Sequence, residues 1–188
     1  WGGGIFKSGD SGAHWNAAIA GFIGVHVDAL AIDPARPAAV YAGAYGGGAF
    51  KSTDGAITWS PINTGFLDGY ITEFALDPTA PGKLFVGDYF GRVYRSFDGG
   101  AHWSLCTYGL QSVTAIGSIV IDPSQTSVLY VTTDEGVFKT QNGGGSWVAK
   151  NTGLPSFPGY LVMDPIAHST LYVVGAFGVA KSTNGADT

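Results

Sequence analysis

Short runs of apolar and small residues alternate with polar, glycine-containing stretches along the whole chain. Residues 27–32, 39–44, 48–52 and 59–62 are four such runs, and each has the length of an ordinary β-strand. Glycine, proline, aspartate or asparagine stands at the boundaries, and no segment has the periodicity of a helix of useful length. The pattern therefore predicts antiparallel strands joined by short turns.

This group of four runs recurs to the end of the chain. The later strands are predicted at residues 71–76, 83–87, 92–96, 103–107, 117–121, 128–132, 136–140, 147–150, 160–163, 170–174 and 179–182. Asp-Pro pairs close the first strand of each group, because proline cannot continue a central ladder and aspartate favours turn initiation. First strands such as 29–32 and 118–121 are almost continuously apolar or small, so we expect them to be packed on both faces.

A polar turn before the last strand of each group is the most regular feature of the sequence. Tryptophan follows this turn at positions 15, 59, 103 and 147, a constant step of 44 residues that indicates a repeat architecture. The side chains that recur in the turns are Ser8, Asp10 and Trp15; Ser52, Asp54 and Trp59; Ser96, Asp98 and Trp103; Thr140, Asn142 and Trp147; and Ser182 and Asn184. We expect them to be structural, because aspartate or asparagine accepts backbone N–H bonds in turns and tryptophan anchors the turn.

These turns resemble the Asp-box, or BNR, motif S-x-D-x-G-x-x-W. Residues 8–15 and 96–103 match it fully, the second copy has Ala56 at the glycine position, and the fourth has Thr140 and Asn142. The resemblance extends over essentially the whole chain. It implies an all-β fold, a β-propeller of four-stranded antiparallel blades in which each box joins the third and fourth strands. Sialidases, xyloglucanases and sortilin-like receptors share this type of repeat.

The repeats also predict the domain organisation. Residues 1–188 are expected to form a single β-propeller region of about four and a third repeats, with partial repeats at both ends. A closed ring of four blades would leave one copy of the third strand unused. We therefore expect an incomplete window on a larger ring of roughly six to eight blades.

Composition narrows the class of function. Charged residues make up only 12% of the chain and 30 residues are glycine, which fits many turns and few solvated helical faces. The net charge of −5 is unsuited to nucleic acid, and no apolar run is long enough for direct membrane insertion. Cys106, the only cysteine, is expected to be a buried small hydrophobe, and the histidines lack metal-ligand spacing. Neither a metal nor another cofactor is expected, and the basic residue before each box is attributed to a repeated strand position.

Candidate binding residues lie on the face opposite the boxes. Connections in an antiparallel blade alternate between two faces, so the boxes and the Asp-Pro loops share one face and the variable links share the other. The candidate ligand-binding residues of that face are Trp1, Tyr45, Tyr89, Phe90, Asp88, Arg92, Asp134 and Glu135. Phe66, Tyr70, Phe157 and Tyr160 could extend the aromatic arc. Aromatic rings suit both sugar rings and protein interfaces.

Two functions remain open at this stage. The first is a non-catalytic, extracytoplasmic binding or assembly module that recognises a protein partner or a glycan, as a subunit of a larger assembly. The alternative is a glycoside hydrolase of the Asp-box endoglucanase type, for which two carboxyl groups about 5–10 Å apart are needed. The three-arginine clamp of sialidases is missing, since only Arg92 is well placed for it, and no catalytic residue is assigned.

Overall fold

The computed structural model describes residues 4–22, 26–154, 158–176 and 178–187, and the described secondary structure consists of strands and turns. No described segment is a helix that could cross a membrane. A leading hairpin contains β1 (Phe6–Lys7) and β2 (Asn16–Ala17). Blade 1 contains β3 (His26–Ile32), β4 (Val40–Tyr45), β5 (Gly48–Ser52) and β6 (Ser60–Pro61). Blade 2 contains β7 (Ile71–Leu76), β8 (Leu84–Asp88), β9 (Val93–Ser96) and β10 (Ser104–Leu105). Blade 3 contains β11 (Ile116–Ile121), β12 (Leu129–Thr133), β13 (Gly136–Thr140) and β14 (Val148–Ala149). Blade 4 contains β15 (Pro158–Met163), β16 (Leu171–Gly175) and β17 (Gly178–Ser182).

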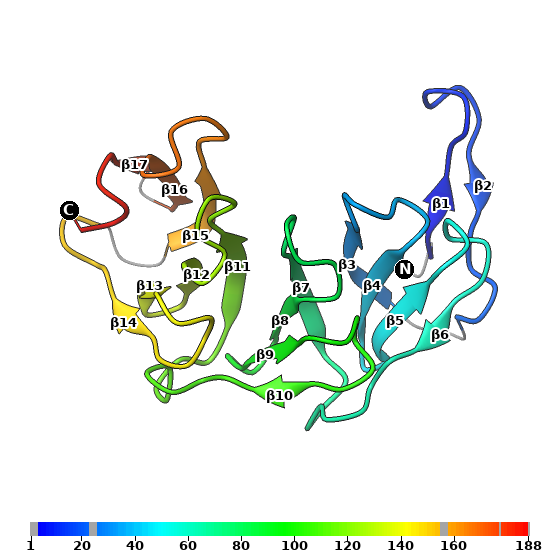
Figure 1. Cartoon of the computed structure of the whole chain (residues 1–188), viewed down its shortest axis with the longest axis horizontal. Helices are drawn as coiled ribbons and strands as arrows, with labels where there is room; N and C mark the ends of the chain where they lie inside the picture. The colour runs from blue at the N-terminus through cyan, green and yellow to red at the C-terminus, as the bar shows by residue number, and fades with distance from the viewer. Residues whose placement is uncertain (1–3, 23–25, 155–157, 177, 188) are drawn as a thin grey trace.

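Every blade is an antiparallel meander in which sequential strands pair side by side. The first strands β3, β7, β11 and β15 also contact one another from blade to blade. Figure 1 shows the blades following one another along an open arc, with the leading hairpin at one end and blade 4 at the other. The predicted all-β propeller arrangement is therefore confirmed, as an arc that does not close.

The box tryptophans join neighbouring blades. Trp59, Trp103 and Trp147 are each only 4% exposed, whereas Trp15 is 62% exposed. The indole N–H of Trp103 donates to the carbonyl oxygen of Ile62 in the preceding blade at 2.8 Å, and those of Trp59 and Trp147 make the same bond one blade away. Trp15 occupies the equivalent place in its hairpin, but no described segment covers its ring.

The basic residue before each box is a second link between blades, a role that the sequence interpretation missed. Lys51 donates from Nζ to the carbonyl oxygen of Gly99 in the next box at 2.9 Å. The same contact, 2.8–2.9 Å long, recurs from Lys7 to Gly55, from Arg95 to Gly143 and from Lys139 to Gly185. Each blade is thereby tied to the box turn of the blade that follows.

The first strands are less uniformly buried than the sequence suggested. Leu30 and Ile32 of β3 are 54% and 58% exposed, and Tyr160 and Val162 of β15 are also exposed. The two β3 side chains lie opposite Ala42 and Val40, which pack toward the leading hairpin. The hairpin at one end supplies only two strands, and at the other end no described blade packs on the far side of β15. The expectation that first strands are packed on both faces is therefore wrong at the ends of the arc.

Candidate functional site

The box turns close upon themselves. The Asp98 carboxylate accepts hydrogen bonds from Ser96 Oγ at 2.8 Å and from the His102 backbone N–H at 3.0 Å, and it also contacts His102 Nδ1. In the fourth box the amide oxygen of Asn142 accepts the equivalent bonds from Thr140 and Ser146. The polar groups of a box are therefore directed at their own turn.

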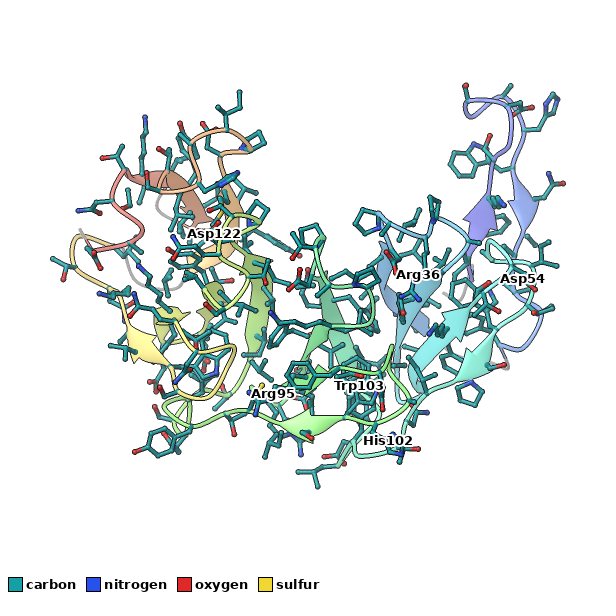
Figure 2. All side chains as sticks on the ribbon, in the orientation of Figure 1. Arg36, Asp54, Arg95, His102, Trp103 and Asp122 are labelled. Atoms are coloured by element: carbon teal, nitrogen blue, oxygen red, sulfur yellow. The ribbon has the colours of Figure 1, made fainter. Side chains whose placement is uncertain are left out.

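Box turns and Asp-Pro loops lie on one face of the arc, as the alternation of connections requires. The Gly99 N–H donates to the Gly82 carbonyl at 2.9 Å, and the boxes of blades 1, 3 and 4 make the same bond to their own Asp-Pro loops. In Figure 2 the labelled residues come from this group of segments: Asp54, His102 and Trp103 from boxes, Arg95 from the strand before a box, and Arg36 and Asp122 from Asp-Pro loops. We call this side the box face and the other side the open face.

Four aromatic rings meet on the open face. Tyr45 is the last residue of β4, the turn between β8 and β9 supplies Tyr89 and Phe90, and Tyr70 ends the link between blades 1 and 2. Ring centroids are 4.6 Å apart for Tyr45–Tyr70, 6.2 Å for Tyr45–Tyr89, 5.4 Å for Tyr70–Phe90 and 5.7 Å for Tyr89–Phe90, all edge to face. These rings, the aromatic tetrad, form a closed cycle in which each ring orients the next.

The tetrad is open to solvent although its rings touch. Tyr45 is 52% exposed, Tyr89 55% and Phe90 46%, while Tyr70 is half-buried. Two glycines permit this arrangement: Gly46 and Gly91 have φ of 75° and 76°, which L side chains rarely adopt. Trp1 and Phe157, expected on the same face, lie outside the described residues. Phe66, expected in the arc, instead stacks on Trp103 at 4.9 Å between blades.

Arg92 borders the tetrad and is held by two carboxylates. Its guanidinium lies 5.0 Å from the Phe90 ring centroid, and its Nε donates to Asp88 at 2.7 Å while NH2 donates to Asp68 at 2.5 Å. Burial would lower the pKa of Arg92, but the bonds to Asp68 and Asp88 raise it overall. The guanidinium is therefore fixed in place beside the exposed rings.

Asp88 occupies a different environment from the one expected for it. Its side chain is fully buried, and it accepts hydrogen bonds from the backbone N–H groups of Phe90 and Arg92, each at 2.9 Å, besides the one from Arg92 Nε. The expectation of a solvent-facing acid at this position is corrected accordingly. The turn folds back over the carboxylate because both backbone donors lie within four residues of it, so Asp88 shapes the turn that presents Tyr89 and Phe90.

Asp134 and Glu135 form the two-residue turn between β12 and β13 in blade 3. Asp134 accepts hydrogen bonds from the backbone N–H groups of Thr114 at 2.9 Å and Ala115 at 3.2 Å, and from the Thr114 hydroxyl. Desolvation would raise the pKa of Asp134, but these bonds lower it overall. Glu135 accepts from Ser112 Oγ at 2.7 Å. Both acids thus tie this turn to the link between blades 2 and 3.

Glu73 is a titratable group that the sequence interpretation did not single out. It is the third residue of β7, at the end of the strand nearest the open face, and is partly buried. Desolvation raises its pKa to about 7. The available signal was a lone glutamate inside a predicted inner strand. Among the described residues, no cluster of three or more His, Cys, Asp or Glu could hold a metal ion.

No family model matches the sequence, and no curated protein matches it. Solved structures do resemble the fold. One is an ancestral GH74 enzyme, with 25% identity and a TM-score of 0.71 over 90% of this chain and 24% of that chain. A GH74 xyloglucanase from Xanthomonas campestris has 20% identity and a TM-score of 0.73 over 93% and 31%. YCF48 bound to D1 peptide has 13% identity and a TM-score of 0.63 over 84% and 50%.

This chain spans about a quarter to a third of the length of those GH74 enzymes and half that of YCF48. All three neighbours are β-propellers, which agrees with the open arc of blades. They include both enzymes and a peptide-bound protein. The shared fold therefore leaves the function to be argued from the site itself.

Proposed function

We propose that this chain is part of a non-catalytic β-propeller module that binds a protein partner through the aromatic tetrad on its open face. The observation that carries the proposal is the solvent exposure of Tyr45, Tyr89 and Phe90 together, in a cluster whose geometry is fixed by ring-to-ring contacts. Clustered exposed aromatic residues are typical of interaction sites, and tyrosine, tryptophan and arginine dominate binding hot spots.

The rings are ordered before any partner arrives. Tyr89 and Phe90 are presented by a turn that the buried Asp88 closes, and the Arg92 guanidinium covers one side of Phe90. An ordered surface loses little side-chain entropy on binding, which favours affinity. The tetrad is therefore suited to anchor an apolar part of a partner.

The same residues argue for binding rather than hydrolysis. The Asp88 carboxylate is buried under its own turn, and Asp134 accepts three hydrogen bonds from the neighbouring link. Both carboxylates are engaged in holding loops in place, and we assign neither as the acid or nucleophile of a glycosidase, which would require a paired acid and base around the scissile bond. A glycan stacked on the exposed rings would be the competing ligand class for the same face.

Capture from the native extract tests the proposal. Tyr89→Ala combined with Phe90→Ala should weaken partner capture by about 1–4 kcal/mol, as truncation of hot-spot residues does. Phe97→Ala is the matched control, because Phe97 is an exposed aromatic residue on the box face. Equal loss with both variants would contradict the proposed location. A screen against glucans and aryl glycosides should show no turnover, and robust hydrolysis would refute the non-catalytic assignment.

The proposal also includes the protein family of this chain and its location in the cell. The self-closing turns around Asp98 and Asn142 support membership of the BNR/Asp-box repeat proteins, and the resemblance to that family supports an extracytoplasmic setting and a place in a larger assembly. Fractionation of the source cells, with detection by an antibody against the chain, tests the location. Recovery in the cytoplasmic fraction alone would contradict it.

A further inference from the structure

Positive charge in this chain is confined almost entirely to the box face. Four basic residues reach the next box turn, and Lys181 holds the equivalent strand position in blade 4. Arg36 and Lys83 bind the carboxylates of Asp-Pro loops, and Lys150 pairs with Asp187 in the last box at 2.7 Å. In the part of the chain that the structure describes, Arg92 is the one lysine or arginine at the open face.

The carboxyl groups, unlike the basic groups, are distributed over both the box face and the open face. Eight of them belong to boxes and Asp-Pro loops, on the side that also carries eight of the nine lysine and arginine residues. The other six lie in open-face links or within three residues of the open-face end of a strand: Asp28, Asp68, Glu73, Asp88, Asp134 and Glu135. Arg92 is the one lysine or arginine beside these six, and His26 contacts Asp28 at 2.9 Å. With histidine counted as neutral and every carboxyl as ionised, the open face carries a formal charge of −5, equal to the formal net charge of the chain. Because desolvation raises the pKa of Glu73 to about 7, part of this charge is absent at neutral pH.

The tetrad lies beside this negative charge. Asp68 contacts Arg92 next to Phe90, and its side chain is 46% exposed. Arg92 is already paired with two carboxylates, so it cannot offset the rest of the charge. Exposed ring faces and carboxylates are the two groups that attract organic cations, through the ring quadrupole and through Coulomb attraction.

The molecule already contains a contact between a cation and an aromatic ring of the tetrad. The Arg92 guanidinium lies 5.0 Å above Phe90 while two carboxylates hold its nitrogens. A second guanidinium or ammonium group could approach the exposed rings of Tyr45 and Tyr89 in the same way. A neutral partner would gain no electrostatic attraction from the negative charge of the open face, and an acidic partner would be repelled by it.

We infer that the partner segment which this face binds is a basic peptide, rich in lysine or arginine and carrying apolar side chains for the tetrad. This inference rests on the proposed function and specifies the chemistry of its partner. Charge complementarity of this kind accelerates association and rejects wrong partners. The binding is therefore expected to weaken as the salt concentration rises.

Three labelled peptides of equal length test the inference by fluorescence anisotropy. Each carries the same leucine and phenylalanine residues, with lysine, serine or glutamate at every second position. The lysine peptide should bind at least about tenfold more tightly than the serine peptide at low salt, and the difference should shrink in high salt. Asp68→Asn should weaken binding of the lysine peptide several-fold and leave the serine peptide unchanged.

Asp10→Asn is the matched control, since it removes one negative charge from the box face at a position where Asn142 and Asn184 occur naturally. Equal effects of the two substitutions, equal binding of the lysine and serine peptides, or preference for a neutral glucan oligosaccharide would each overturn the inference. The proposed function is judged separately by the Tyr89→Ala and Phe90→Ala pair. If that pair abolishes capture of the native partner while the peptides show no charge preference, only the inference of a basic partner is lost.

Discussion

A single carboxylate or amide side chain organises each box turn. Asp98 Oδ1 accepts two hydrogen bonds within its own turn, while Ser96 Oγ accepts one from the Gly100 backbone N–H at 2.9 Å. Those bonds, made inside eight residues, fix a tight connection in which Phe97 stays 66% exposed and Trp103 is the large side chain that becomes buried. Each box turn is therefore formed by hydrogen bonds between residues close together in the sequence.

Asp98→Ala is expected to lower the free energy of unfolding by about 1 kcal/mol, because the turn donors lose their acceptor while the half-exposed site lets water replace part of it. Asp98→Asn should cost less, since Asn142 serves in the same position of the fourth box. Urea unfolding followed by tryptophan fluorescence measures both. A greater loss with Asn than with Ala would contradict the acceptor role.

Glu73 predicts a pH dependence of stability. Desolvation raises its folded-state pKa to about 7, above its ordinary value of 4.5, so the folded state binds the proton more tightly than the unfolded chain does. The stabilisation is fully present below about pH 4.5 and is lost as pH rises through about 7. Glu73→Gln should flatten this part of the profile in unfolding experiments at several pH values, and an unchanged slope would refute it.

At the scale of the blade, the glycine after each fourth strand lets the next box tryptophan approach the backbone. Gly65 has φ of 104°, and a Cβ atom there would lie 2.1 Å from the Trp103 carbonyl oxygen. The Trp103 backbone N–H in turn donates to the Thr64 carbonyl at 2.8 Å. Gly21 and Gly109 make the same close approach to Trp59 and Trp147. The packing of one blade on the next thus requires glycine at these positions, because any Cβ atom would clash with the tryptophan backbone.

Gly65→Ala should reduce stability by about 3 kcal/mol or more, since both the backbone angle and the contact with Trp103 forbid a methyl group. Gly153→Ala is its control: φ is 77° there, but no atom of the described residues lies within 4 Å of the added Cβ. Gly153→Ala should therefore lower the free energy of unfolding by only about 1 kcal/mol, the cost of the backbone strain. Similar melting temperatures for the two variants would show that the close approach to tryptophan is unimportant.

At the scale of the whole molecule, burial depends on position along the arc. Leu30 and Ile119 occupy equivalent sites, each the second residue after the bulge of its first strand, opposite Ala42 and Val131. Ile119 lies between two complete blades and is 5% exposed, whereas Leu30 faces the two-stranded hairpin and is 54% exposed. Equivalent residues in the repeat therefore contribute unequally to stability.

Ile119→Ala is expected to cost about 2–5 kcal/mol, the usual range for emptying a packed core site. Leu30→Ala in the same chain should cost less than about 1 kcal/mol, because most of its side chain already contacts water. Thermal unfolding of the two variants gives the comparison. Equal losses would indicate that the exposed face of β3 is covered in solution.

Much of the fold is specified by neighbours in sequence. The tryptophan spacing, the Asp-Pro pairs and the alternation of apolar runs predicted the strands of blades 1 to 4 to within a few residues, because turns and ladders form from nearby backbone groups. The burial of Cys106 was predicted as well, and desolvation raises the pKa of its thiol to about 12. Tyr45, Tyr89 and Phe90 were placed correctly on one face by counting strands.

Burial, pairing and charge distribution were decided by the tertiary structure. Nothing near Asp88 in the sequence shows that its carboxylate is enclosed, and nothing near Lys51 reveals its bond to Gly99, 48 residues away. The contact between Tyr45 and Tyr70 and the concentration of the net charge on the open face likewise depend on which loops the arc brings together. These properties depend on through-space distances to residues far apart along the chain, and such distances are set only when the blades pack.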